Sequence, residues 1–183
     1  MVSGLVSMPL VLPPVVVGYF LLLLLGPRGP LGGVTEALLG HALPFTWVAA
    51  AVAATVMGFP LMVMALRQAF ESVDENLEQA AATLGAPPLR VFWTVTLPLS
   101  RGGLVAGSSL CFARSLGEFG ATVTLAGNIM GETRTLPLAI WTALQSPGGE
   151  AVAWRLTWIC VGLSLVAALL SAVLLRKRRG GTA

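Results

Sequence analysis

Three long apolar stretches without a charged residue constrain the fold of this chain more than any other feature. They cover residues 5–25, 45–66 and 156–175. A helix needs about 20 apolar residues to cross a hydrocarbon core of about 30 Å, and each stretch has that length. A fourth stretch, residues 102–117, is interrupted only by Arg114. The sequence therefore predicts an all-α integral membrane protein, with about four full spans in a single domain over residues 1–183.

Charge content supports the same class. Charged residues make up 10% of the 183 residues, whereas a soluble domain carries about 25%. A run of basic residues, 176–179, follows the last apolar stretch directly. In a soluble protein such a run would suggest nucleic acid, but after an apolar stretch it indicates a cytoplasmic membrane anchor next to lipid. We expect no nucleic-acid partner.

Residues 119–147 form two shorter apolar pieces separated by Glu132 and Arg134. Neither piece is long enough to span, so we expect two short re-entrant or interfacial helices on the outer side. Irregular backbone at membrane depth persists only against protein or a water-filled cavity. This segment is therefore expected to pack against protein or to line a water-filled cavity.

Four spans would place both termini on one side of the membrane. The loop over residues 67–101 and the basic tail would then share the cytoplasm, and they carry most of the arginines. This distribution satisfies the excess of basic residues found in cytoplasmic loops. We expect a multi-pass protein of the bacterial cytoplasmic membrane with a cytoplasmic C-terminus.

The first stretch contains Pro9, Pro13, Pro14 and Gly18. Each proline removes a helical hydrogen bond, so a kinked or broken helix is expected. The bend would either improve the packing of the helices or supply a flexible element in a pathway through the membrane.

The loop over residues 67–101 has the pattern of a compact helix–turn–helix. Ser72 and Glu75 have capping-box spacing, which predicts a helix over residues 73–84. Gly85 suits a left-handed helix end, Pro87 and Pro88 prevent continuation, and a second short helix is expected over residues 89–96. The Ala-rich face either docks into a partner or is purely structural.

The sequence offers no site for catalysis. Cys111 and Cys160 lie in apolar stretches without a CxxC spacing, and His41 is the single histidine. We therefore expect no enzyme activity, no metal site and no cofactor in this chain.

The loop contains Gln79-Ala80-Ala81, then Gly85 after three residues, and Val95-Thr96-Leu97-Pro98 after nine more. This series resembles the EAA loop of binding-protein-dependent ABC importer permeases, E-A-A-x3-G-x9-I-x-L-P. Gln79 replaces the leading glutamate, with Glu78 one place early, and Val95 replaces isoleucine. The resemblance implies that the loop couples the spans to an ATPase subunit through Glu78, Gln79, Ala80, Ala81, Gly85, Leu97 and Pro98.

Three further segments, residues 9–19, 112–122 and 131–137, resemble molybdate importer permeases. The resemblance implies a type I ABC importer transmembrane domain that works as a homodimer. Its partners would be two cytoplasmic ATPases, which hydrolyse the ATP, and an external substrate-binding protein. Members of the family have one more span before the proline-rich one, so either the start is misassigned, which we favour, or the chain is a fragment. Sulfate, thiosulfate or tungstate transport stays an alternative, as does a non-transporting scaffold that docks a cytoplasmic partner.

Arg114 and Glu118 have i,i+4 spacing within membrane depth, where charges are costly unless paired or facing water. They form either an intrahelical pair that stabilises a helix end or part of an anion path. Polar side chains that would line such a path with them are Ser108, Ser109, Thr122, Thr124 and Asn128.

Overall fold

The computed structural model describes residues 2–179, and the side chains among them except Val2, Ser3, Leu5 and those of residues 170–179. The described part is helical and contains no strand. Its elements are α1 (Val2–Val11), α2 (Pro14–Leu25), α3 (Gly32–Leu39), α4 (Trp47–Glu71), α5 (Glu75–Thr83), α6 (Pro88–Val91), the π-helical turn η1 (Phe92–Thr96), α7 (Leu97–Leu116), α8 (Gly120–Leu125), α9 (Leu136–Leu144) and α10 (Glu150–Arg179).

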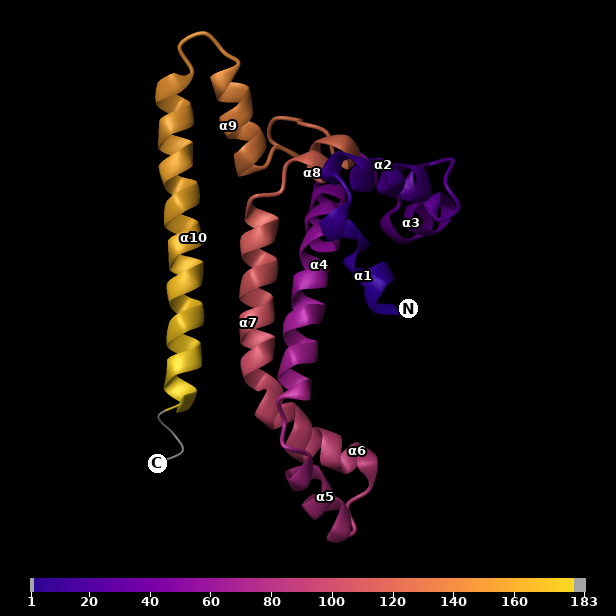
Figure 1. Ribbon diagram of the computed structural model, residues 1–183. Coiled ribbons are helices and arrows are strands. Elements are labelled where there is room, and N and C mark those ends of the chain that lie inside the picture. Colours follow the sequence, from indigo (N-terminus) through magenta and orange to yellow (C-terminus); the bar gives the residue numbers. More distant parts are fainter. Residues whose placement is uncertain (1, 180–183) are drawn as a thin grey trace.

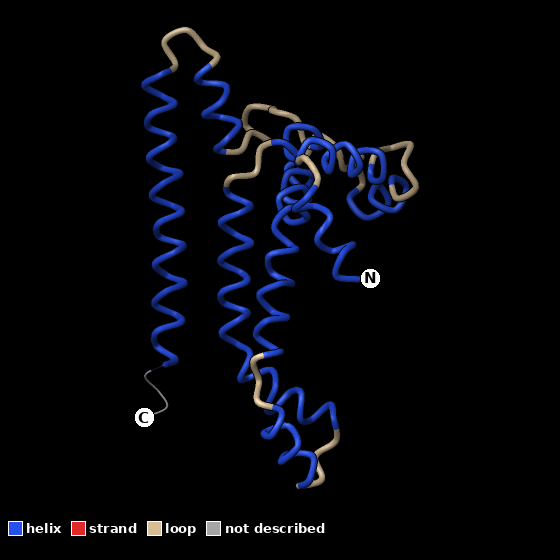
Figure 2. The backbone as a smooth tube through the Cα atoms, viewed as in Figure 1, coloured by secondary structure: helices blue, strands red, loops and turns tan. Residues whose placement is uncertain are grey.

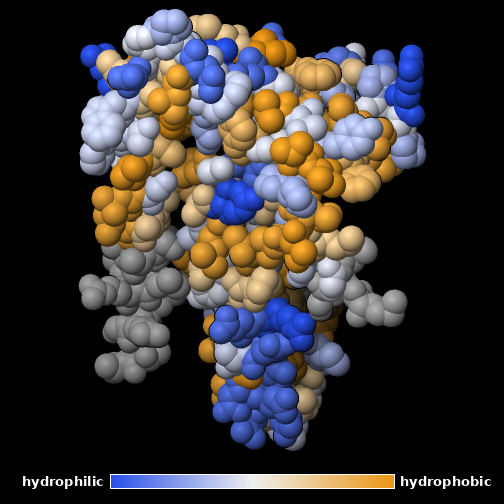
Figure 3. All heavy atoms as spheres, turned by 45° about the horizontal axis from the view of Figure 1, so that its top comes forward, coloured by the Kyte–Doolittle hydropathy of each residue, from blue (hydrophilic) through white to orange (hydrophobic). Residues whose placement is uncertain are grey.

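Three long helices, α4, α7 and α10, run lengthwise and set the long axis of the molecule (Figure 1). The loop formed by α5, α6 and η1 projects at one end. The short helices α2, α3, α8 and α9 gather at the other end (Figure 2). Helix α10 ends on the same side of the molecule as the projecting loop. Hydrophilic side chains cover that loop in Figure 3, whereas the rest of the surface seen there mixes hydrophobic side chains with hydrophilic ones.

Helices α4 and α7 pack closely because glycines line their contact. A Cβ on Gly103 would lie 2.1 Å from Ala69 Cβ, and one on Gly107 would lie 2.7 Å from Met62 Sδ. These two glycines are four residues apart and so share a helix face. Small residues at this spacing let two helix backbones approach within a membrane, where packing drives association.

The first apolar stretch is two helices, as its prolines predict. Helix α1 ends at Val11, and α2 starts at Pro14 after an extended Pro13 with φ −55° and ψ 133°. Helix α2 then extends sideways from the upper end of α4, crosswise to the long helices (Figure 1). Residues 5–25 therefore do not form one continuous spanning helix in this structure.

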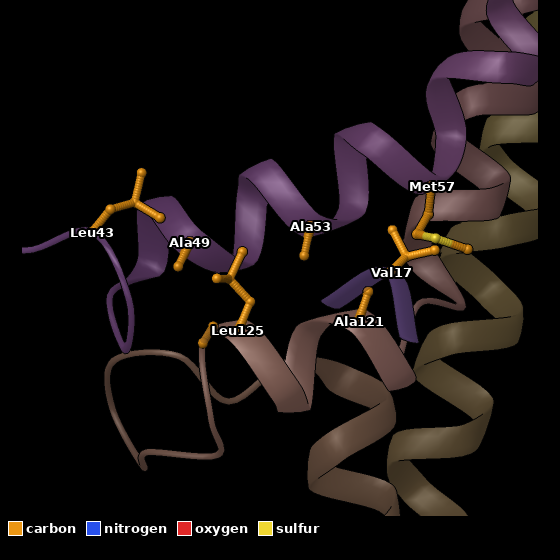
Figure 4. Packing of buried hydrophobic residues seen from close by; sticks show 8 residues of the cluster. Val17, Leu43, Ala49, Ala53, Met57, Ala121 and Leu125 are labelled. Atoms are coloured by element: carbon orange, nitrogen blue, oxygen red, sulfur yellow. The ribbon is translucent and has the colours of Figure 1, made fainter. Parts of the chain in front are cut away.

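The buried core lies where α2, α4 and α8 meet. It consists of Val17, Leu43, Ala49, Ala53, Met57, Ala121, Leu125 and Ala126, and Figure 4 shows side chains from all three helices pointing toward one another. Gly18 makes this meeting possible, because a Cβ there would lie 2.7 Å from the carbonyl oxygen of Ala121. The core thus fixes α8 and the segment that follows it.

Within the described residues, two helices are long and apolar enough to cross a membrane by length and composition. They are α4 and the described part of α10, Glu150–Leu169. Helix α7 has 20 residues but carries Arg101 and Arg114, and the first stretch is broken. The count of four spans stays a prediction. Helix α3 was not expected, because its sequence begins with two glycines and follows a Pro- and Gly-rich stretch.

Candidate functional site

Helix α5 of the projecting loop begins differently from the prediction. Asp74, not Ser72, caps it, since the Asp74 side chain accepts a hydrogen bond from the Asn76 amide at 2.9 Å. Helix α4 continues to Glu71, and the Ser72 hydroxyl donates to the Ala69 carbonyl oxygen at its end. The capping box of Ser72 and Glu75 is therefore wrong, because Ser72 belongs to the preceding helix end.

Gly85 has the left-handed conformation that its position predicts, with φ +83°. A Cβ at this glycine would meet no atom within 4 Å. Space around the residue is therefore open, and backbone conformation alone restricts what can replace it. A residue other than glycine pays about 1–2 kcal/mol in this region, and asparagine adopts it more readily than most.

The second expected helix, residues 89–96, is formed by α6 and η1 together, and these continue into α7 without a break. In η1 the Leu97 amide donates to the Phe92 carbonyl oxygen, five residues back. Leu97 and Pro98 are therefore the first residues of α7. Single π-helical turns within α-helices are frequent at functional sites.

A pocket of about 510 Å³ lies between α5 and the α6–η1 segment. Its lining residues are Glu78, Gln79, Ala82, Ala86, Pro88, Val91, Phe92 and Thr96. Glu78 is turned inward and accepts a hydrogen bond from the Thr96 hydroxyl, which ties α5 to η1. Gln79 and Ala80 are exposed, and Ala81 is half-buried.

The loop also exposes apolar side chains. Leu84 is 89% exposed and Leu89 is 71% exposed, on either side of the Gly85 turn. Both leucines therefore lie on the outer surface of the loop.

Arg114 and Glu118 form an ion pair with 2.7 Å between Nη1 and Oε2, as their spacing predicts. The Glu118 side chain is 1% exposed and that of Arg114 is 28% exposed. Oε1 of Glu118 also accepts a hydrogen bond from the Ala121 amide at 2.9 Å. The buried carboxylate therefore joins the end of α7 to the start of α8.

The four hydroxyl residues expected along an anion path lie on α7 and α8, and two of them form hydrogen bonds within their own helix. Ser109 donates to the Val105 carbonyl oxygen and Thr124 to that of Gly120. Ser108 is exposed, with its hydroxyl 3.9 Å from Met62 Sδ on α4. The Thr122 hydroxyl is buried and has no hydrogen-bond partner among the described residues.

Asn128 belongs to a polar cluster that the sequence analysis did not find. Its Nδ2 donates to Thr142 Oγ1 at 2.8 Å, and its Oδ1 accepts from Arg134 Nε at 2.8 Å. Asn128 and Thr142 are 14 residues apart, on opposite sides of a loop. No local spacing rule predicts that pairing, although an arginine between two apolar pieces was a signal for it.

A metal site is not formed by the part of the chain that the structure describes, since no group of three His, Cys, Asp or Glu side chains comes together there.

Comparison with known proteins identifies the family. The family described as "Binding-protein-dependent transport system inner membrane component" matches residues 1–180. The molybdenum transport system permease protein ModB of Escherichia coli K12 is 52% identical over 179 residues, covering 98% of this chain and 78% of the relative. The protein of the same name from Haemophilus influenzae is 49% identical over 171 residues, covering 93% of this chain and 75% of the relative.

A more distant relative with that name, from Mycobacterium tuberculosis, is 46% identical over 162 residues, covering 88% of this chain and 61% of the relative. Similarity of this extent includes the projecting loop, the helices α4 and α7 and the polar segment around α8 and α9. This chain belongs to the family of binding-protein-dependent transport system inner membrane components.

Proposed function

We propose that this protein is the permease subunit of an ATP-driven molybdate importer in the bacterial cytoplasmic membrane. The observation that carries the proposal is the similarity to molybdenum transport permeases over 98% of the chain. The all-α architecture and the apolar surface of α4 and α10 agree with a membrane location. ATP hydrolysis would belong to a partner subunit and substrate capture to an external binding protein.

The finer architecture is part of the same proposal. A type I importer domain would work as a pair of permeases, each with about four spans. Three would be helices over residues 45–66, 102–117 and 156–175, and the segment 5–25 would cross as the two helices α1 and α2. The α5–η1 loop would lie in the cytoplasm together with the end of α10, which points to the same end of the molecule. The short helices α8 and α9 would then lie on the outer side.

The ATPase subunit would contact the surface around Gln79, Ala80 and Gly85, because these residues are exposed on the projecting loop. Glu78 would act inside the loop by holding Thr96, so that α5 and η1 move together. Leu97 and Pro98 would carry that movement into α7, since no flexible linker separates η1 from α7.

Expression of this chain with its ATPase and binding protein is expected to restore molybdenum accumulation in cells that lack their own molybdate permease. Molybdenum per cell would be measured by mass spectrometry at submicromolar molybdate, with and without excess sulfate, thiosulfate or tungstate. Full inhibition by sulfate or thiosulfate would assign the protein to those ions instead. Binding of the ATPase without any oxyanion uptake would identify a scaffold and overturn the transport proposal.

Gly85→Glu is expected to uncouple ATP hydrolysis from transport, because it adds bulk and charge to the proposed docking surface and strains the backbone at φ +83°. Gly85→Asn is the matched control, since asparagine tolerates the left-handed region. Uptake in proteoliposomes should fall by about tenfold or more in the glutamate variant, the loss expected for about 1.4 kcal/mol of coupling. Normal uptake by Gly85→Glu would show that the surface around Gly85 does not couple the permease to the ATPase.

A further inference from the structure

Arg134 has a different kind of side-chain partner from Arg67 and Arg114. Arg114 is neutralised by Glu118 and Arg67 by Glu71, each at 2.7 Å. Arg134 instead donates its Nε to the neutral amide oxygen of Asn128. Among the described residues it has no ion-pair partner, and Glu132 two residues earlier is exposed and forms no ion pair with it.

The guanidinium is held in a fixed position by a chain of hydrogen bonds. Asn128 is itself fixed by Thr142, whose hydroxyl donates to the Leu138 carbonyl oxygen within α9. The loop before Arg134 is also tightly folded, because the Ile129 carbonyl oxygen accepts the amides of residues 132, 133 and 134. Orientation through Nε leaves both Nη groups of Arg134 available as a fork of donors.

A second donor without a partner lies next in the chain. The Thr135 hydroxyl oxygen is buried and makes no hydrogen bond within the described residues. A buried hydroxyl without a partner is destabilising, and such groups in native proteins call for an explanation such as an ion or a ligand. Arg134, which has no ion-pair partner among the described residues, is thus followed by a buried hydroxyl without a hydrogen-bond partner.

We propose that Arg134, oriented by Asn128 and Thr142, forms a transient binding site for the tetrahedral oxyanion at the end of the protein opposite the α5–η1 loop. This inference rests on the proposed function. A dianion would supply the missing counter-charge, and its oxygens match the planar fork of a guanidinium. Because a single arginine holds the anion, the site binds weakly and releases it easily, as a conduit requires.

A small anion fits this site better than a carboxylate from a partner protein. Arg134 is half-buried, whereas Met130 in the same loop is 80% exposed. A docking protein would contact exposed side chains such as Met130 more readily than Arg134. A free oxyanion is small enough to contact a half-buried arginine.

Asn128→Asp is the decisive variant, because it keeps an acceptor for Arg134 Nε and places a fixed carboxylate against the guanidinium. The site would then be neutralised without loss of the arginine. Arg134→Gln removes the charge directly, and Arg134→Lys keeps it. Arg155→Gln is the matched control. Arg155 is an exposed arginine near the start of α10, and α10 starts at the end of the molecule where α8 and α9 lie.

The permease would be assembled with its ATPase and binding protein in proteoliposomes, and uptake of radiolabelled molybdate measured at subsaturating concentration. Asn128→Asp and Arg134→Gln should reduce uptake by about tenfold to a hundredfold, as expected for loss of a charge-assisted hydrogen bond. Arg134→Lys should retain part of the activity, and Arg155→Gln should match the wild type. Retention of binding protein by the immobilised permease would be measured in parallel.

Wild-type uptake by Asn128→Asp would overturn the inference while leaving the proposed function intact. Uptake that falls only in proportion to lost binding-protein retention would also overturn it, since Arg134 would then receive the partner. Absence of molybdate uptake by the unaltered protein would defeat the proposed function instead. If either variant fails to assemble, comparison of Arg134→Lys with Arg134→Met decides, because these two differ mainly in charge.

Discussion

Gly103→Ala is expected to destabilise the packed pair of α4 and α7 severely, although it adds a single methyl group. The new Cβ would lie 2.1 Å from Ala69 Cβ and 3.0 Å from the Ala65 carbonyl oxygen. Both Cβ atoms are attached to backbone, so no rotamer change relieves the clash and the helices must separate. Overpacking typically costs about 1–3 kcal/mol, and this position belongs at the upper end of that range. Gly103→Leu should exceed it.

The methyl group can be moved across the interface to test this explanation. Ala69→Gly combined with Gly103→Ala should recover much of the stability, less about 1 kcal/mol for a glycine within a helix. Gly162→Ala is the matched control, because a Cβ on this glycine of α10 would meet nothing within 4 Å. Stability would be measured by thermal unfolding in detergent. Equal stability of the Gly103 and Gly162 variants would contradict the close packing.

Arg114→Met is expected to destabilise the protein by about 3–5 kcal/mol, the usual cost of leaving one member of a buried ion pair alone. The Glu118 carboxylate is 1% exposed, and Arg114→Met would leave it buried with only the Ala121 amide as a donor. Unfolding in detergent would again be the measurement. Loss of transport should accompany the loss of stability, because Glu118 fixes α8 relative to α7.

Glu118→Gln should be milder, since the amide oxygen can still accept from one of the two donors, Ala121 or Arg114, and no unpaired carboxylate is left. Addition of Glu118→Gln to Arg114→Met should therefore restore stability relative to Arg114→Met alone, because the unpaired charge is removed. Arg67→Met is the control at an exposed pair, with side chains 63% and 61% exposed, and it should change stability little. Equal effects of Arg67→Met and Arg114→Met would show that burial does not determine the strength of these pairs.

Features that depend on residues close in sequence were predictable. The break at Pro13, the left-handed Gly85, the two short helices within residues 119–147 and the Arg114–Glu118 pair all follow from local rules. Each involves positions at most four residues apart, or a residue type with a strong backbone preference. The family was likewise recognised from motifs of fixed spacing.

Features that depend on tertiary contact were missed. Ser72 was assigned to the wrong helix, because it ends α4 by donating to Ala69, whereas Asp74 caps α5. Gly103 and Gly107 were visible as a pair, but the residues that they face on α4 were not. The Asn128–Thr142 hydrogen bond and the Glu78–Thr96 hydrogen bond join positions 14 and 18 residues apart, beyond any helical periodicity.

The π-helical turn η1 determines how the α5–η1 loop is rotated about the axis of α7. In an α-helix, residues five apart point about 140° away from each other, because each residue turns the helix by about 100°. Val91 and Thr96 are five apart, yet both line the pocket beside Glu78, since η1 widens the helix between them. Conversion of this one turn to α-helix would rotate Thr96 away from Glu78 or carry α6 around the axis of α7. The orientation of the whole loop thus depends on η1, a five-residue segment whose hydrogen bond reaches one residue further than in an α-helix.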